Sequence, residues 1–136
     1  MSAALPASAV HKLVPLLYVS DMNRSAAFYD NKLGFEITQH WSPEGKMLWC
    51  LLARGGAELM LQQADAEDGP AEGRGRGVMF FFHCDDADAM HAELLANGLK
   101  LDPPQVAFYG MKQLFLKDPD GYQLCFQNRV ENREQS

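Results

Sequence analysis

Residues 19–35 read VSDMNRSAAFYDNKLGF, and this stretch decides how the rest of the chain divides. Asp21 is a residue type that caps helix N-termini, and Gly34 is the type that ends helices in the left-handed conformation. Between them, apolar residues recur at helical spacing, which predicts a helix over residues 23–33. Because an apolar run precedes this helix, we expect a strand over residues 13–19. A strand followed by a helix therefore opens the fold.

The same pattern recurs later in the chain. Asp85 and Gly98 are 13 residues apart, as are Asp21 and Gly34, and an apolar run precedes each pair. Apolar runs separated by turn residues after each helix predict three further strands in each copy. The predicted elements are strand 13–19, helix 23–33 and strands 35–41, 46–53 and 57–63, then strand 78–84, helix 87–97 and strands 99–101, 110–117 and 122–127.

The repeat predicts an α+β fold built from two βαβββ modules. We expect a single domain, 1–136, divided into module one at 11–63, a linker at 64–77, module two at 78–127 and a polar tail at 128–136. Helices would cover the outer face of each curved, mixed sheet and leave the other faces to form a groove. A groove between repeated units is a common ligand site.

Composition narrows the classes of function. The chain has 12 Lys and Arg against 18 Asp and Glu, and this net charge of −6 disfavours nucleic acid and anionic membranes as partners. The charge favours a cationic or neutral small molecule. No apolar run approaches the ~20 residues that span a bilayer, and the first residues lack a signal-peptide pattern. Cys50, Cys84 and Cys125 lie in apolar sequence, as buried free thiols do, so we expect a cytoplasmic protein.

Several motifs together resemble one family. The segments VSD at 19–21, SAAFY at 25–29, LGF at 33–35 and DPDG at 118–121 are similar to those of the vicinal-oxygen-chelate superfamily of glyoxalases, bleomycin-resistance proteins and extradiol dioxygenases. The resemblance covers residues 13–127 and implies the βαβββ fold. It also implies a homodimer, since family members with two modules usually pair and so cover exposed strand edges.

Catalytic members of this superfamily hold a divalent metal through His, Gln or Glu on the first and fourth strands of each module. Counting from the helix caps and the DPDG glycine places these four slots at Val14, Met60, Met79 (or Val78, if Asp85 rather than Asp86 is the equivalent cap) and Cys125. None of these side chains carries the oxygen or imidazole ligand that a hard or borderline cation prefers. The resemblance therefore implies the fold but not the metal.

Strand alternation indicates which side chains would line the groove. Phe81 and His83 share a face with Met79, whereas Phe80 and Phe82 point toward the helices. Core packing is the commoner role of aromatic residues, but a metal-free groove lined by rings would suit an apolar, aromatic or cationic ligand. The candidate groove residues are Val14, Leu16, Tyr18, Trp41, Trp49, Met60, Met79, Phe81, His83, Tyr109 and Cys125.

Three hypotheses of function follow. The leading one is a metal-independent binding protein, similar to the bleomycin-resistance branch, that sequesters a small molecule with no cofactor and no catalytic residue. The alternative is a metal-dependent lyase, isomerase or dioxygenase whose metal site is displaced onto Glu58, His83 and Cys125. The third is a partner-binding or regulatory module without a small-molecule ligand. The chemistry of the groove distinguishes these hypotheses.

Overall fold

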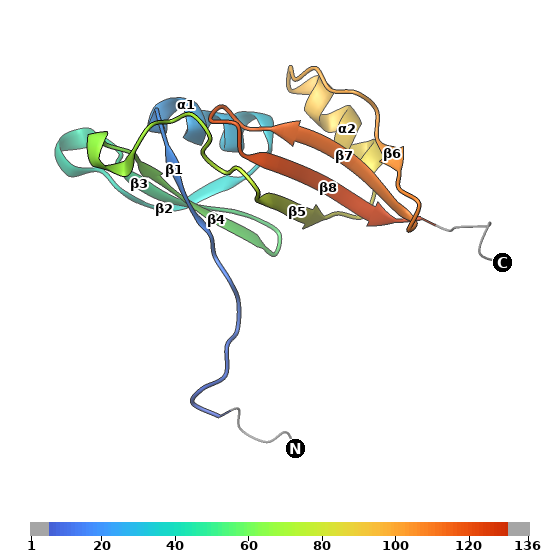
Figure 1. The fold of residues 1–136 in the computed structure, drawn as a ribbon, viewed down its shortest axis with the longest axis horizontal. Coiled ribbons are helices and arrows are strands. Elements are labelled where there is room, and N and C mark those ends of the chain that lie inside the picture. The colour runs from blue at the N-terminus through green and yellow to red at the C-terminus, as the bar shows by residue number, and fades with distance from the viewer. Residues whose placement is uncertain (1–5, 131–136) are drawn as a thin grey trace.

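The computed structural model describes residues 6–130 and contains two βαβββ modules, which confirms the predicted α+β class (Figure 1). Module one comprises β1 (Leu16–Val19), α1 (Met22–Ala27), β2 (Glu36–Trp41), β3 (Trp49–Arg54) and β4 (Ala57–Gln63). Module two comprises β5 (Met79–His83), α2 (Ala87–Ala96), β6 (Gln105–Val106), β7 (Met111–Lys117) and β8 (Gln123–Arg129).

Both sheets have the same topology. The strand order is β1-β4-β3-β2 in module one and β5-β8-β7-β6 in module two. In each sheet the first strand pairs in parallel with the fourth, and the other neighbours pair antiparallel. The repeat in the sequence is therefore a repeat of a complete mixed sheet.

The predicted strand over residues 99–101 is wrong. The Leu99 N–H donates to the Leu94 carbonyl at 3.1 Å, so this segment ends α2 instead of joining the sheet. Pro103 and Pro104 follow, and neither offers the N–H that a strand ladder requires. The strand occurs after the prolines, as the short β6, which pairs antiparallel with β7.

Other element ends differ from prediction by a few residues. A 3₁₀ turn at Pro43–Gly45 lies between β2 and β3, and β3 begins at Trp49 rather than residue 46. The last strand continues to Arg129, beyond the predicted end at 127. Residues 131–136 of the predicted polar tail lie outside the described residues. The linker contains a 3₁₀ turn at Ala66–Asp68.

The helix of module one changes character midway. Asp21 caps α1, and its carboxylate accepts the Arg24 N–H at 3.2 Å. After α1 the chain continues as a π-helical turn, Phe28–Lys32, within which Tyr29 is fully buried. Gly34 ends this turn at φ +73°, and a Cβ there would lie 2.7 Å from the Arg54 guanidinium. Within residues 6–130, no helix is long and apolar enough to cross a membrane.

Residues of the VSD, SAAFY and DPDG motifs join the two modules. The Tyr29 hydroxyl donates to Asp118 Oδ2 at 2.7 Å, and both side chains are buried. Asp118 Oδ1 accepts the N–H groups of Asp120 and Tyr122, which holds the DPDG turn in shape. Asp120 in turn accepts the N–H and hydroxyl of Ser20. The turn before β8 is therefore bound to the start of the helix in module one.

An aromatic cluster continues the hydrophobic core across the boundary between the two modules, which we call the joint. Phe35 packs edge-on against Tyr29 and Phe82, with ring centroids 5.9 and 5.7 Å apart. Phe82 stacks on Phe126 at 5.0 Å. All four rings belong to one buried cluster that includes residues of both sheets. The modules therefore share one hydrophobic core.

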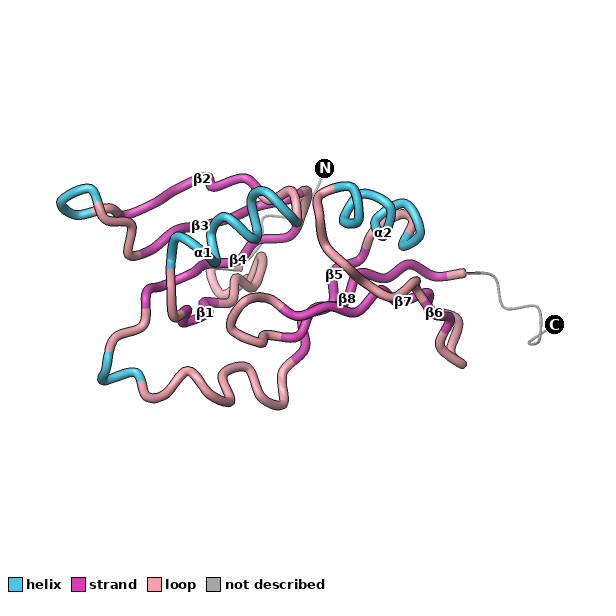
Figure 2. The backbone as a smooth tube through the Cα atoms, turned by 90° about the horizontal axis from the view of Figure 1, so that it is seen from above, coloured by secondary structure: helices cyan, strands magenta, loops and turns pink. Residues whose placement is uncertain are grey.

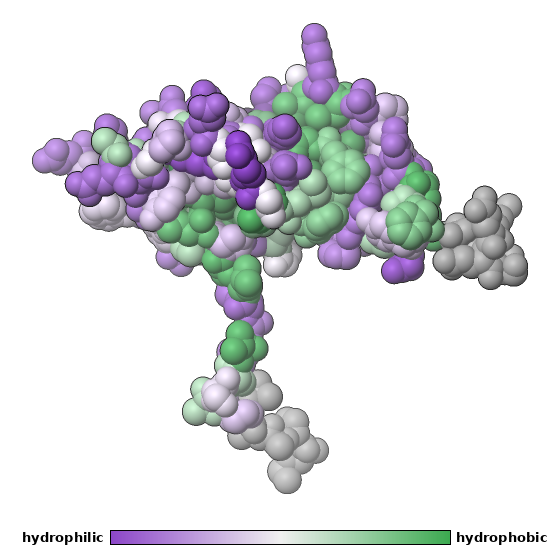
Figure 3. Space-filling model, viewed as in Figure 1, coloured by the Kyte–Doolittle hydropathy of each residue, from purple (hydrophilic) through white to green (hydrophobic). Residues whose placement is uncertain are grey.

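Both helices lie on the same side of the two sheets (Figures 1 and 2). Residues that face the helices, such as Leu17 and Leu124, are buried, whereas several large apolar residues on the opposite faces are exposed. We call these opposite faces the open faces of module one and module two. Within one chain they lie side by side, and neither covers the other. Figure 3 shows hydrophobic surface where the modules meet and along the N-terminal arm, residues 6–15.

Candidate functional site

The open face of module one carries two adjacent tryptophans. Trp41 and Trp49 are cross-strand partners, and Gln62 pairs with Trp49 on the other side and with Tyr18 beyond it. The two tryptophans and Gln62 line a hollow of about 810 Å³. Trp41 is 59% exposed. Ligand pockets of drug-sized molecules have this volume, and here Lys46 and Asp65 add charged groups to the aromatic lining.

A second row on the same face contains Met60, one of the positions that the family resemblance assigns to metal ligands, and Val14, another, lies beside it. Leu16, Met60 and Leu51 pair in that order across β1, β4 and β3, and Val14 lies just before β1. Leu16, Tyr18 and Met60 lie on this face but do not line the hollow beside the tryptophans. The row contributes apolar surface and one thioether, but no charge.

The open face of module two centres on two phenylalanines with a thiol between them. Phe81, Cys125 and Phe115 pair in that order across β5, β8 and β7. The rings are 47% and 50% exposed, whereas Cys125 is fully buried and cannot contact a ligand directly. Burial raises the pKa of the Cys125 thiol to about 11, so it is protonated at neutral pH and is not an activated nucleophile. Met79 and Phe115 line a smaller hollow of about 230 Å³.

The next row on this face is polar, and sequence reasoning missed most of it. Gln113 and Gln127 are cross-strand partners, and His83 pairs with Gln127 on β5. Gln113 Nε2 donates to Tyr109 Oη at 2.7 Å and to Gln127 Oε1 at 2.9 Å. We call Tyr109, Gln113 and Gln127 the amide cluster. Both glutamines lie two positions from a residue of the aromatic row, and this alternation was the available signal.

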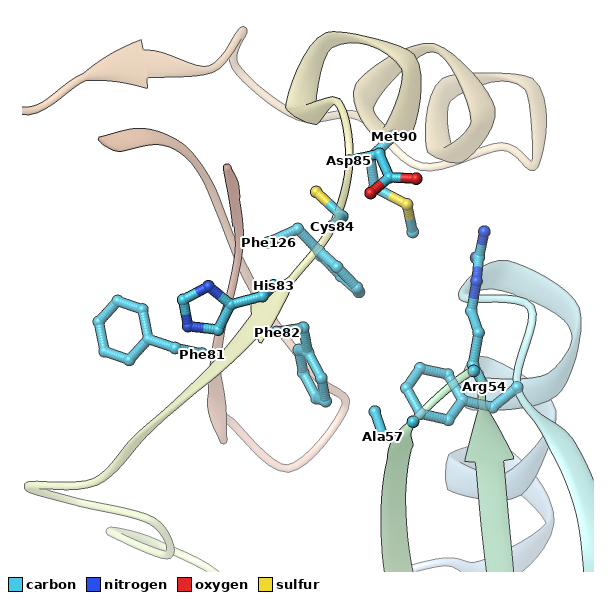
Figure 4. A pocket seen from close by; sticks show the side chains of 12 residues that line it. Arg54, Ala57, Phe81, Phe82, His83, Cys84, Asp85, Met90 and Phe126 are labelled. Atoms are coloured by element: carbon cyan, nitrogen blue, oxygen red, sulfur yellow. The ribbon is translucent and has the colours of Figure 1, made fainter. Parts of the chain in front are cut away.

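A third hollow, of about 590 Å³, lies at the seam between the modules (Figure 4). Phe82 and Phe126 lie among its apolar lining, and His83 and Arg54 contribute polar groups. The Arg54 guanidinium donates to both carboxylate oxygens of Glu93, at 2.7 and 3.0 Å. This ion pair connects β3 to α2 and neutralises the charge of the Arg54 guanidinium. The residues of this hollow therefore mainly hold the two modules together.

Charge is distributed unevenly between the two open faces. On module two the strand positions that face this side include Lys117, Arg129 and His83, and within the described strands they include no Asp or Glu. On module one this side carries Glu36 and Glu58. The net charge of −6 therefore does not describe the surface that a ligand on module two would meet.

The residues present do not fit a metal centre. No group of three or more His, Cys, Asp or Glu among residues 6–130 could hold a metal ion. The structure does not assemble the alternative trio of Glu58, His83 and Cys125. Glu58 lies on the sheet of module one, where it pairs with Lys12 of the N-terminal arm, and Cys125 is enclosed in the sheet of module two.

Comparison with known families gives one match by sequence. The profile of the Glyoxalase/Bleomycin resistance protein/Dioxygenase superfamily matches residues 10–126, which is most of the chain. No curated protein matches the sequence. The matched segment contains all the strands of both sheets except the end of β8.

Comparison with solved structures gives many matches of the same fold. TnmS3, an antibiotic binding protein from Streptomyces sp. CB03234, superposes with a TM-score of 0.69 at 25% identity, covering 90% of this chain and 98% of that chain. A protein of unknown function from Agrobacterium tumefaciens str. C58 gives 0.70 at 22% identity, covering 90% and 97%. A glyoxalase/bleomycin resistance protein/dioxygenase from Nocardioides gives 0.69 at 19% identity, covering 92% and 89%.

Proposed function

The chain belongs to the glyoxalase/bleomycin resistance protein/dioxygenase superfamily, and we propose that it binds a small aromatic molecule without a metal ion, like the bleomycin-resistance branch. The observation that carries this proposal is the chemistry of the four positions that the family resemblance assigns to metal ligands, which hold Val14, Met60, Met79 and Cys125. None of these side chains offers charge to neutralise a divalent cation, and Val14, Met60 and Met79 instead offer apolar surface. The protein then acts by sequestering its ligand, without a cofactor or chemical turnover.

The exposed rings support an aromatic ligand. Trp41, Phe81 and Phe115 present large ring surfaces on the open faces, and Trp49 lines the hollow beside Trp41. Aromatic ligands gain from stacked and edge-on contacts with such rings in addition to the burial of apolar area. That TnmS3 is named an antibiotic binding protein supports the same class of role here.

We propose further that a second copy of the chain completes the site. A ligand on either open face of a single chain would be covered from one side only. Exposed apolar residues also continue onto the N-terminal arm, where Val10 and Leu13 are almost fully exposed. A homodimer would bury these residues and place one open face against another. Sedimentation at micromolar concentration tests this proposal, and a monomer would contradict it.

The proposed location is the cytoplasm. Cys50, Cys84 and Cys125 are free thiols, and burial raises the pKa of each. Thiols persist in this state in a reducing compartment. Disulfide mapping of the protein purified from its host would test the location, and a quantitatively oxidised pair would contradict it.

Elemental analysis and ligand titration on the same purified protein test the proposed function. We expect less than stoichiometric transition metal, and saturable quenching of the tryptophan fluorescence by the tricyclic aromatic probe fluorenone. Trp41→Ser should weaken the binding of this probe, whereas Leu95→Ser, on the exposed side of α2, is the matched control and should not. Tight 1:1 binding of Zn²⁺ or Fe²⁺, or no binding of any tricyclic aromatic probe, would overturn the proposal.

A further inference from the structure

The amide cluster is an unusual feature for a sheet face that is otherwise aromatic. Gln113 and Gln127 are only 7% and 8% exposed, and both lie in the middle of β7 and β8. Buried amides are costly unless they are hydrogen-bonded, and these two bond to each other. Their bond and the Tyr109 contact fix the direction in which each amide points. The cluster is therefore a preorganised set of polar atoms.

The hydrogen-bonding capacity of the cluster is only partly used. Gln113 donates both of its N–H groups, one to Tyr109 Oη and one to Gln127 Oε1. Tyr109 therefore accepts and keeps its own hydroxyl hydrogen, and Gln127 keeps both hydrogens of its amide nitrogen. Among residues 6–130 no other hydrogen bond engages these donors. The cluster offers three donor hydrogens, and its one acceptor atom without a hydrogen bond is the Gln113 carbonyl oxygen.

The position of the cluster relates these donors to the aromatic row. Gln113 and Gln127 lie two positions along their strands from Phe115 and Cys125, which is roughly 7 Å on the same face. This distance is about the width of a fused aromatic ring system. A planar ligand in contact with Phe81 and Phe115 would thus bring one edge to the amide cluster.

The charges around the cluster disfavour a cation at that edge. Lys117 lies on the same face beyond the aromatic row, and Arg129 lies on it beyond the row of the two glutamines. His83 flanks Gln127, and the strand positions of this face hold no carboxylate. The sequence-based expectation of a cationic ligand rests on the net charge and on the aromatic ring faces, but the acidic residues lie elsewhere. The local field instead favours an electron-rich oxygen.

We propose that Tyr109, Gln113 and Gln127 determine ligand specificity, and that they select aromatic molecules carrying a carbonyl oxygen over cationic ones of similar size. This inference rests on the proposed function, since it names the ligand class for the same site. The carbonyl oxygen accepts hydrogen bonds from the Tyr109 hydroxyl and the Gln127 amide. The rings of the ligand contact Phe81 and Phe115.

Three tricyclic probes of similar size test the selection. Fluorenone carries the carbonyl, fluorene lacks it, and proflavine carries a positive charge. We expect fluorenone to bind about tenfold more tightly than fluorene, because a hydrogen bond in a dry site contributes that much. Proflavine should bind no more tightly than fluorene. If fluorene or proflavine binds as tightly as fluorenone or more tightly, the inference is overturned and the proposed function stays intact.

Two variants assign the effect to the cluster. Tyr109→Phe and Gln127→Met should each lower the affinity for fluorenone toward that for fluorene, and leave the fluorene affinity unchanged. Tyr122→Phe, which removes a hydroxyl that donates to the Tyr18 carbonyl at the joint, is the matched control and should change neither. Tyr109 is 45% exposed, so its variant is expected to fold even if Gln127→Met does not. An equal loss for fluorenone and fluorene in Tyr109→Phe would contradict the role of the hydroxyl. If none of the three probes binds the unmodified protein, the proposed function fails instead.

Discussion

The two modules have the same strand order but present different chemistry on their open faces. Module one offers Trp41 and Trp49 with acidic residues, whereas module two offers Phe81 and Phe115 with amides and basic residues. Topology depends on the helix caps, the turns and the buried side of each strand, and these are similar in the two copies. The open face is free to differ, because alternation separates it from the core.

The helices of the two modules differ in a related way. α2 is a regular α-helix, whereas α1 passes into a π-helical turn that contains Tyr29. π-Helical turns inside helices often mark sites with a special role. Here the turn supplies the residue that bonds to Asp118 of module two. The irregular helix therefore supplies a buried contact to the joint, whereas the regular one reaches module one through the partly exposed Glu93.

The largest effect is expected from breaking the apolar part of the joint. Phe35→Ala should lower the free energy of unfolding by about 3–5 kcal/mol, because it removes a buried ring and leaves a cavity beside Phe82. Both tryptophans lie in module one, so their fluorescence reports on that module, and far-UV circular dichroism reports on both. Because the core is shared, the two signals should follow one urea transition.

Phe115→Ala is the control for this prediction, since it removes a ring of the same size from the open face of module two. Its cost should be well below that of Phe35→Ala. Separate midpoints for fluorescence and circular dichroism in the unmodified protein would show that the modules unfold independently.

The next effect concerns the polar part of the joint. Tyr29→Phe should lower the free energy of unfolding by about 1–3 kcal/mol at pH 7, because it leaves Asp118 Oδ2 buried without its donor. Burial raises the pKa of Asp118, and the Tyr29 hydrogen bond opposes that shift. The raised pKa contributes stability below the unfolded pKa, and this contribution is lost as the pH rises through the folded pKa.

The variant raises the pKa of Asp118 further, so the difference from the unmodified protein should shrink as the pH falls from 7 toward the ordinary aspartate pKa, about 4. Urea unfolding of both proteins at the two pH values measures this difference. Tyr122→Phe is the matched control, and its loss should depend less on pH. A loss in Tyr29→Phe that is the same at both pH values would contradict the proposed role of Asp118.

Most of the fold could be predicted from the sequence because its determinants are local. Asp21, Gly34 and the DPDG turn each cap or turn the chain where predicted. β6 could not be placed in this way, because it forms only by pairing with β7 after Pro104. The π-helical turn at Phe28–Lys32 was also missed, since the apolar spacing there predicts a regular helix.

The candidate site was predictable only in part. Alternation placed Tyr18 and Phe81 on the side away from the helices, and both are partly exposed there. It could not reveal that Cys125 is enclosed by its neighbours, or that Gln113 and Gln127 bond to each other. Those facts depend on how strands distant in sequence are brought into register.

A smaller effect is expected for ligand affinity, and it shows whether both open faces act on one ligand. Trp41→Ala and Phe81→Ala should each weaken fluorenone binding by about 1–2 kcal/mol, since each removes part of a ring contact. If a dimer places the two faces against each other, the effects should appear in both variants. Titration monitored by tryptophan fluorescence measures the affinity, with Trp49 alone as the reporter in Trp41→Ala and both tryptophans in Phe81→Ala. Weakening in only one variant would assign the ligand to one module.

The smallest effect is expected from the ion pair between the modules. Glu93→Gln should lower the free energy of unfolding by less than about 1 kcal/mol, because Arg54 and Glu93 are 34% and 42% exposed and solvent screens them. Hydrogen bonding to Arg54 lowers the pKa of Glu93, so its contribution is present above the ordinary glutamate pKa and lost as the pH falls through the lowered one. The difference measured by unfolding at pH 7 should therefore shrink as the pH is lowered below the ordinary glutamate pKa, about 4. Asp88→Asn, which removes the Lys112 pair within module two, is the control and should cost a similar amount. A loss for Glu93→Gln well above that of the control would mean that charge, rather than the shared aromatic core, holds the modules together.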